Sequence, residues 1–101
     1  MSLSDLLAED RRLGILRALD AAQGGVANDA VLATALAYLG HEVAGDIVRA
    51  DLAWLAAHGL VEIEDLGTQR RPMLRVRLRE AGQDVARGRL HPGVAPPRAA
   101  P

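Results

Sequence analysis

The side chains best suited to binding chemistry in this 101-residue chain are arginines, because all twelve of its basic residues are arginine. A guanidinium group donates paired hydrogen bonds to phosphates and to guanine, so arginine is the usual residue for such contacts. The candidates for DNA contact are Arg49, Arg70, Arg71, Arg75 and Arg77. Codon bias in a GC-rich genome is the alternative explanation of this arginine usage, and the frequent alanine and glycine agree with it.

The charges are unevenly distributed, although the net charge is only −1. Residues 1–66 carry eleven acidic and four basic residues, whereas residues 67–101 carry eight arginines and two acidic residues. Attraction to phosphates supplies most of the non-specific affinity of proteins for DNA. The C-terminal third of the chain is therefore the better basic candidate.

We find no arrangement of residues typical of catalysis or metal binding. Cysteine is absent, which excludes thiolate nucleophiles, disulfides and cysteine-based zinc sites. His41, His58 and His91 are scattered and lack a second ligand at a suitable spacing. Gly24-Gly25 lacks the neighbouring residues of a phosphate-binding loop. We therefore expect no enzyme activity, no cofactor and no metal.

The N-terminus lacks the features of a secretion signal, and no apolar stretch approaches the ~20 residues that cross a bilayer. We expect a cytoplasmic protein with no membrane partner.

The elements that position the arginines follow from the period of the hydrophobic residues. Helical spacing predicts helices over residues 3–22, 29–39 and 45–58, with Ser4 and Asn28 as caps of the first two. After Gly59 the pattern alternates, which predicts strands over 60–64 and 74–78 joined by a polar loop. A short helix over 79–87 follows.

This order predicts a mainly α structure with a β-hairpin, of the α+β class. Two helices joined by a tight turn and followed by a two-stranded ribbon form the winged helix-turn-helix arrangement. We expect one such domain over residues 1–90. From His91 onward the chain is rich in proline and alanine, so residues 91–101 are expected to form a disordered tail.

Two resemblances agree with this fold. The residues Leu52, Leu55, Gly59, Leu60 and Val61 match the Leu-x-x-Leu-x-x-x-Gly-Leu-Val pattern of MarR- and ArsR-type winged helices, and the segment resembles their third helix and first wing strand.

Residues 1–90 also resemble a family of small winged-helix proteins of Mu-like phages and prophages. Leu7 to Leu16 and Val48 to Leu55 carry that similarity. The resemblance implies a winged-helix fold and a phage or prophage origin, and it assigns no activity.

The third helix of a winged helix can enter the major groove of DNA. Its outward positions here include Arg49, but Asp46 and Asp51 lie on the same helix and oppose phosphate attraction. Arg49 is therefore either a DNA contact or an ordinary solvated or ion-paired surface residue.

The hairpin offers two kinds of arginine. Arg75 and Arg77 share one face of their strand, and antiparallel pairing is expected to place Glu62 and Glu64 opposite them, which would neutralise their charge. Arg70 and Arg71 lie in the loop without an obvious partner. They are the strongest candidates for phosphate contact, and a mobile, solubilising loop is the alternative.

A second apolar line on the third helix contains Ile47 and Trp54, which mark a partner-binding surface if Trp54 is exposed. Packing of Trp54 in the core or against the first helix is the favoured alternative. The leucines at the start of the first helix lead us to expect a homodimer.

The sequence therefore supports two functions. One is a DNA-binding module, such as a phage- or prophage-encoded transcriptional regulator, whose third helix and wing arginines contact duplex DNA. The other is a module of the same fold that binds a phage or host protein and no DNA.

Overall fold

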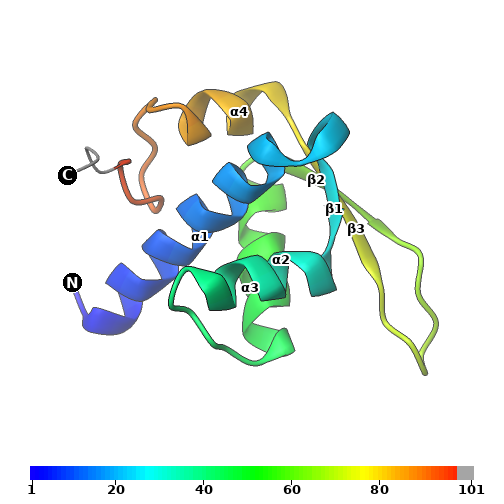
Figure 1. The fold of residues 1–101 in the computed structure, drawn as a ribbon. Coiled ribbons are helices and arrows are strands. Elements are labelled where there is room, and N and C mark those ends of the chain that lie inside the picture. Colours follow the sequence, from blue (N-terminus) through cyan, green and yellow to red (C-terminus); the bar gives the residue numbers. More distant parts are fainter. Residues whose placement is uncertain (98–101) are drawn as a thin grey trace.

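The computed structural model describes residues 1–97 and has the predicted α+β class. The helices are α1 (Leu3–Ala21), η1 (Gln23–Gly25), α2 (Asp29–Tyr38), α3 (Gly45–Ala57) and α4 (Glu80–Ala86), of which η1 is a short 3-10 helix. The strands are β1 (Val26–Asn28), β2 (Val61–Asp65) and β3 (Leu74–Leu78). Figure 1 shows the four α-helices gathered beside a sheet whose β2–β3 hairpin projects away from them. The ends of each predicted element lie within one residue of the observed ends.

The first two α-helices begin at side chains that satisfy free backbone donors. At α1 the hydroxyl of Ser2 accepts a hydrogen bond from the backbone N–H of Asp5, whose carboxylate accepts one in return from the N–H of Ser2. Ser4 lies inside the first turn, so its prediction as the cap is wrong. At α2 the side chain of Asn28 accepts from Val31 N at 2.8 Å, which confirms that prediction.

Strand β1 was missed by the sequence analysis. It is three residues long, and it pairs with β3 so that the sheet has the order β1-β3-β2. Gly24 and Gly25 have φ values of +71° and +67°, a backbone conformation that glycine adopts readily, and they turn the chain from α1 into β1. Because β1 anchors β3, the hairpin is part of a three-stranded sheet.

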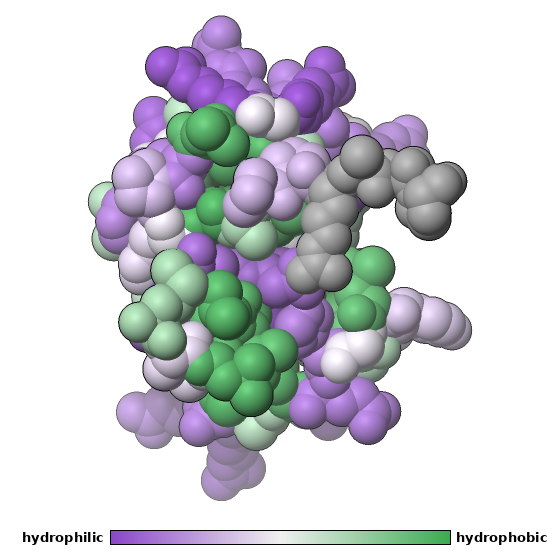
Figure 2. Space-filling view, turned by 90° about the vertical axis from the view of Figure 1, so that its left-hand side faces the viewer, coloured by the Kyte–Doolittle hydropathy of each residue, from purple (hydrophilic) through white to green (hydrophobic). Residues whose placement is uncertain are grey.

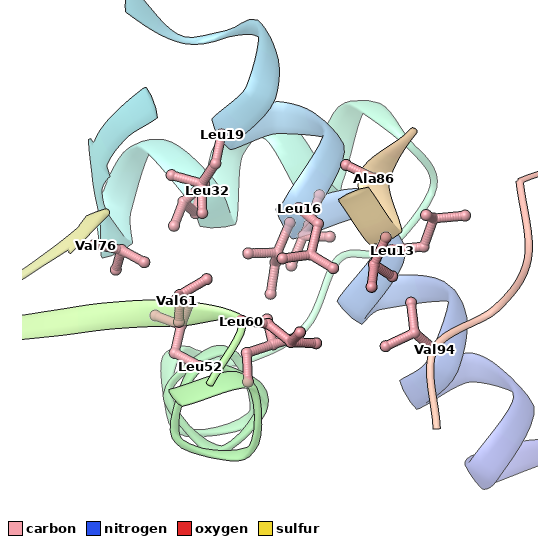
Figure 3. Packing of buried hydrophobic residues seen from close by; sticks show 14 of the residues in the cluster. Leu13, Leu16, Leu19, Leu32, Leu52, Leu60, Val61, Val76, Ala86 and Val94 are labelled. Carbon is pink, nitrogen blue, oxygen red and sulfur yellow. The ribbon is translucent and has the colours of Figure 1, made fainter. Parts of the chain in front are cut away.

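The core lies between the helices and one face of this sheet (Figure 3). It is aliphatic, since the chain has no phenylalanine and its one tryptophan is only partly buried. Val61 and Val76 point into it from the sheet, whereas Glu62, Arg75 and Arg77 on the opposite face are exposed. Burial of each large side chain contributes about 1.5–3 kcal/mol to folding. The side chains with less than 2% exposure from the helices are Ile15, Leu16, Leu19, Leu32, Leu36, Val48, Leu52 and Leu55.

Residues 91–97, here called the C-terminal segment, pack against α1. Val94 is 5% exposed, and the backbone N–H of Ala95 donates to the carbonyl of Glu9. The guanidinium of Arg12 donates to the carbonyl of Gly93 at 2.8 Å. The predicted disordered tail is therefore wrong for these residues, because local composition does not reveal contacts with a helix eighty residues earlier. The rest of that prediction, residues 98–101, lies outside the described residues.

Gly93 provides a test of this packing. A Cβ at Gly93 would lie 2.4 Å from Trp54 Cζ2, and its φ of +87° disfavours any other residue. Gly40 has a similar φ of +94° but open space around it. We expect Gly40→Ala to lower the free energy of unfolding by about 1–2 kcal/mol through backbone strain alone. Gly93→Ala should cost about 1–3 kcal/mol more because of the clash. Chemical denaturation measures both, and equal losses would show that the segment is not packed as described.

Candidate nucleic-acid interface

Helix α3 presents one apolar face to the core and an opposite face of mostly small residues to solvent. Val48, Leu52 and Leu55 are buried, as the helical spacing predicted. The outward positions Asp46, Arg49, Ala50, Ala53 and Ala57 are all exposed. The short alanine side chains leave this face open to close approach, and its two charges balance.

Asp51 does not belong to that exposed face, which corrects the sequence analysis. Its side chain is buried, and Arg11 Nε donates to it at 2.6 Å across the interface between α1 and α3. Arg12 Nε lies 3.8 Å from the same carboxylate. The negative charge of Asp51 is therefore compensated inside the protein and opposes phosphate attraction much less than the sequence suggested.

Arg49 lies back over the first turn of its own helix. One guanidinium nitrogen is 3.1 Å from the position that a Cβ of Gly45 would occupy, so the missing side chain at Gly45 leaves room for it. Arg49 is exposed and takes part in no ion pair within residues 1–97. Its charge remains available at the N-terminal end of α3. The space that Gly45 leaves for this side chain is not evident from the sequence.

The loop between β2 and β3 ends in a hydrogen-bonded turn. Thr68 N donates to the carbonyl of Arg71, and Arg71 N donates to the carbonyl and the hydroxyl of Thr68. Gly67 permits the close approach of the two sides of the loop, because a Cβ there would lie 2.3 Å from the backbone nitrogen of Met73. Arg70 and Arg71 are exposed and form no ion pair with any residue that the structure describes.

Arg75 and Arg77 lie opposite acidic residues, as the sequence analysis expected. The strand register pairs Arg75 with Glu64 and Arg77 with Glu62. A nitrogen of Arg75 is 3.7 Å from Glu64 Oε1, and both side chains are about half exposed. An exposed pair of this kind adds little stability, roughly 0–1 kcal/mol, but it offsets the local charge. These two arginines are therefore weaker candidates for phosphate contact than the pair at the loop tip.

Trp54 is partly buried on the side of α3 that faces α1. The ring of His58 stacks on it with centroids 3.8 Å apart, and His91 meets it edge-on at 5.8 Å. The guanidinium of Arg12 lies 4.1 Å from the indole centroid. Because these groups contact the indole, it presents little free surface to a partner. Ile47, two turns earlier on α3, remains 39% exposed.

No group of three or more potential ligands gathers into a metal site within residues 1–97. None of the helices among these residues is both long and apolar enough to cross a membrane.

Comparison with known proteins identifies relatives of this chain. No family model matches it, and no solved structure does. Uncharacterized protein gp26 of Escherichia phage Mu is 43% identical over 97 residues, which cover 95% of this chain and 96% of that protein. The chain belongs to the family of phage Mu gp26. This membership confirms the predicted relation to Mu-like phage proteins.

A second relative of this gp26-family chain comes from Haemophilus influenzae. It is 41% identical over 66 residues, which cover 65% of this chain and 64% of that protein. The match to phage Mu gp26 covers nearly the whole length of both proteins, so the similarity extends across the domain. Neither printed name states a ligand or an activity.

The pairing of α1 with α3 in this gp26-family protein is open to test at Asp51. Replacement by alanine leaves Arg11 buried without its partner, and we expect the free energy of unfolding to fall by about 3–5 kcal/mol. Asp46→Ala, on the exposed face of the same helix, should change stability by roughly 0.5 kcal/mol or less. Urea denaturation compares the two, and a similar small effect at both positions would argue against a structural role for the buried pair.

A second ionic contact makes stability depend on pH. Hydrogen bonds from Arg87, directly after α4, and from Gln83 on α4 lower the pKa of Asp20 on α1 below its usual value. A lowered pKa in the folded state stabilises the protein above the unfolded value of about 4, and this contribution is lost as the pH falls through the folded value. We expect the melting temperature of Asp20→Asn to lie below that of the wild type at pH 7 and to approach it in acid.

Melting curves from pH 7 to pH 2 measure this difference. In a protein that carries Arg87→Gln, the replacement Asp20→Asn should change the melting temperature less over the same pH range. The reason is that the hydrogen bond from Arg87 is the main cause of the lowered pKa of Asp20. A gap between wild type and Asp20→Asn that is independent of pH would contradict the assignment.

Proposed function

We propose that this protein is a winged-helix module that binds duplex DNA and acts as a phage- or prophage-encoded transcriptional regulator. In this proposal α2 and α3 form the helix-turn-helix, and the β2–β3 hairpin is the wing. The element order along residues 1–97 and the pairing of β1 with the hairpin support it. The proposal assigns binding and no chemical step to the protein.

The observation that carries the proposal is the pair of exposed arginines at the tip of the hairpin. Arg70 and Arg71 lie at the far end of a projecting ribbon (Figure 1), and no acidic side chain of the described residues pairs with them. Two adjacent unpaired guanidinium groups suit contact with backbone phosphates or insertion into a minor groove. Within residues 1–97 neither guanidinium group takes part in a hydrogen bond or an ion pair, and Arg71 contributes to the turn only through its backbone.

Helix α3 supplies the second contact in this proposal. Figure 1 shows its N-terminal end and the hairpin tip both toward the lower side of the molecule. Arg49 is near that end of α3, beside the alanines of the exposed face. One arginine on a face of small residues can reach a guanine in the major groove. With a single arginine there, we expect modest sequence specificity and strong dependence on salt.

A protein-binding module without DNA affinity is the second candidate. The balanced charges of Asp46 and Arg49 on α3, and the pairing of Arg75 with Glu64, favour it because they reduce attraction to phosphates. In this alternative the partner is a phage or host protein.

Fluorescence anisotropy with a labelled mixture of duplexes at low salt tests the proposal. We expect salt-sensitive binding by the wild type. Arg70→Ala/Arg71→Ala should weaken it and reduce the slope of log affinity against log salt by about 2, since two phosphate contacts are lost. The matched control is Arg79→Ala/Arg89→Ala, which removes the same charge away from the tip.

Unchanged affinity of the control would assign the effect to the hairpin tip. Equal weakening of both variants would instead indicate a response to overall charge. If the wild type binds no duplex at low salt, the proposal fails and the protein-binding alternative stands.

A further inference from the structure

Helix α2 has a composition that its surroundings do not explain. After Asp29 it contains no charged residue, yet Val31 and Tyr38 on its outward side are 54% and 89% exposed. A helix that is apolar on all sides is ordinarily buried. The uncharged outward side of α2 therefore indicates a surface that another molecule covers.

A groove runs beside this surface, between α1 and α2. Its volume is about 580 Å³, and most of its lining is apolar. Small residues keep it open: Gly14 and Ala18 on α1, and Ala35 on α2. A Cβ at Gly14 would lie 3.1 Å from the side chain of Leu39, so glycine also permits the close approach of the two helices.

The start of α1 is a second apolar surface without a partner in the chain. Leu3, Leu6 and Leu7 are 70%, 49% and 42% exposed, and the buried residues of α1 begin only at Leu13. Figure 2 views the side on which this end of α1 lies, and it shows hydrophobic side chains gathered in the lower half of that face. Apolar area of this kind marks an interaction site.

The charges beside the groove identify what covers it. Asp10 and Arg17 both line the groove on α1, seven residues or about 10 Å apart, and Leu13 and Gly14 lie between them. If a second α1 lies antiparallel over this stretch, with the two-fold axis midway between Asp10 and Arg17, Asp10 of each copy meets Arg17 of the other. A two-fold axis repeats every contact, so two opposite-charge pairs form at once.

Both charges are available for this pairing. Arg17 is exposed and forms no ion pair with any residue from 1 to 97. Asp10 Oδ2 lies 2.7 Å from His41 Nε2. The side chain of Asp10 is 39% exposed, so its carboxylate can accept further hydrogen bonds. The same antiparallel arrangement brings the N-terminal leucines of each copy toward the C-terminal half of α1 of the other.

We propose that the groove between α1 and α2 is the interface of a symmetric dimer of this chain, with the α1 helices antiparallel and Asp10 paired with Arg17 of the second copy. A small apolar ligand would fill the groove but leave the leucines at the start of α1 exposed. A second copy covers both surfaces and matches the charges. The proposal is independent of DNA binding.

Charge exchange tests this arrangement on the full chain. By sedimentation equilibrium we expect a dimer for the wild type, and a dissociation constant raised at least about a hundredfold for Asp10→Arg and for Arg17→Asp, because each creates two like-charged pairs. The double variant Asp10→Arg/Arg17→Asp should dimerise again. A mixture of the two single variants should form a heterodimer, since both pairs are then complementary.

Circular dichroism and melting curves establish that each variant is folded. Tyr38→Glu provides an independent check at a side chain too exposed to matter for folding, and it should also weaken the dimer. A monomeric wild type at 0.1–1 mM, a concentration range in which even an interface with a Kd of about 100 μM assembles, overturns the proposal. So does a dimer that the single charge reversals leave intact. If both single variants form homodimers and their mixture contains no heterodimer, the interface lies elsewhere.

Discussion

The buried carboxylate of Asp51 is the interaction on which the arrangement of this small domain depends. A charge removed from water is costly unless an opposite charge and hydrogen bonds replace its hydration. Arg11 meets that requirement from α1, which fixes the register between α1 and α3. Arg12 extends the contact, since its guanidinium lies near Asp51 and Trp54 and donates to the backbone of the C-terminal segment. Two consecutive arginines thus connect three separate parts of the chain.

This connection determines which charges remain at the surface. With Asp51 turned inward, the exposed face of α3 carries one acid and one arginine among alanines. On the sheet, Arg75 forms an ion pair with Glu64, and Arg77 lies opposite Glu62 in the strand register. Among residues 1–97, the arginines that form no ion pair include Arg70 and Arg71 at the hairpin tip, Arg17 on α1 and Arg49 on α3. A chain with almost no net charge consequently has local surfaces of distinct character: a basic hairpin tip, an α2 without charge after Asp29, and an α1 that carries both signs.

The helices and the hairpin were predictable because each has a hydrophobic period of its own. Val48, Leu52 and Leu55 repeat along one side of α3, and Glu62 and Glu64 alternate with the buried side chains of β2. β1 was not predictable, since three residues between two helices carry no period and the strand exists only through its pairing with β3.

The candidate site was likewise predictable only in part. Local spacing predicts that Arg70 and Arg71 lie in the loop and that the arginines of β3 lie opposite acidic residues. The strand register confirms that Glu62 and Glu64 lie opposite β3. The inward turn of Asp51 was not foreseen, because a single acidic residue on a helix looks the same in sequence whether it faces water or a buried arginine. The docking of residues 91–97 was missed for a related reason: backbone hydrogen bonds and glycine contacts hold most of that segment.

The stack around Trp54 has a practical consequence. The chain contains one tryptophan, so its tryptophan emission comes from a single known position. That indole touches a cation from α1, an imidazole from the residue that follows its own helix and another from the C-terminal segment. Separation of any of these parts alters the polarity around the ring and therefore its spectrum. The protein carries an intrinsic optical probe at the junction where its distant segments meet, which makes assembly of the fold visible without a label.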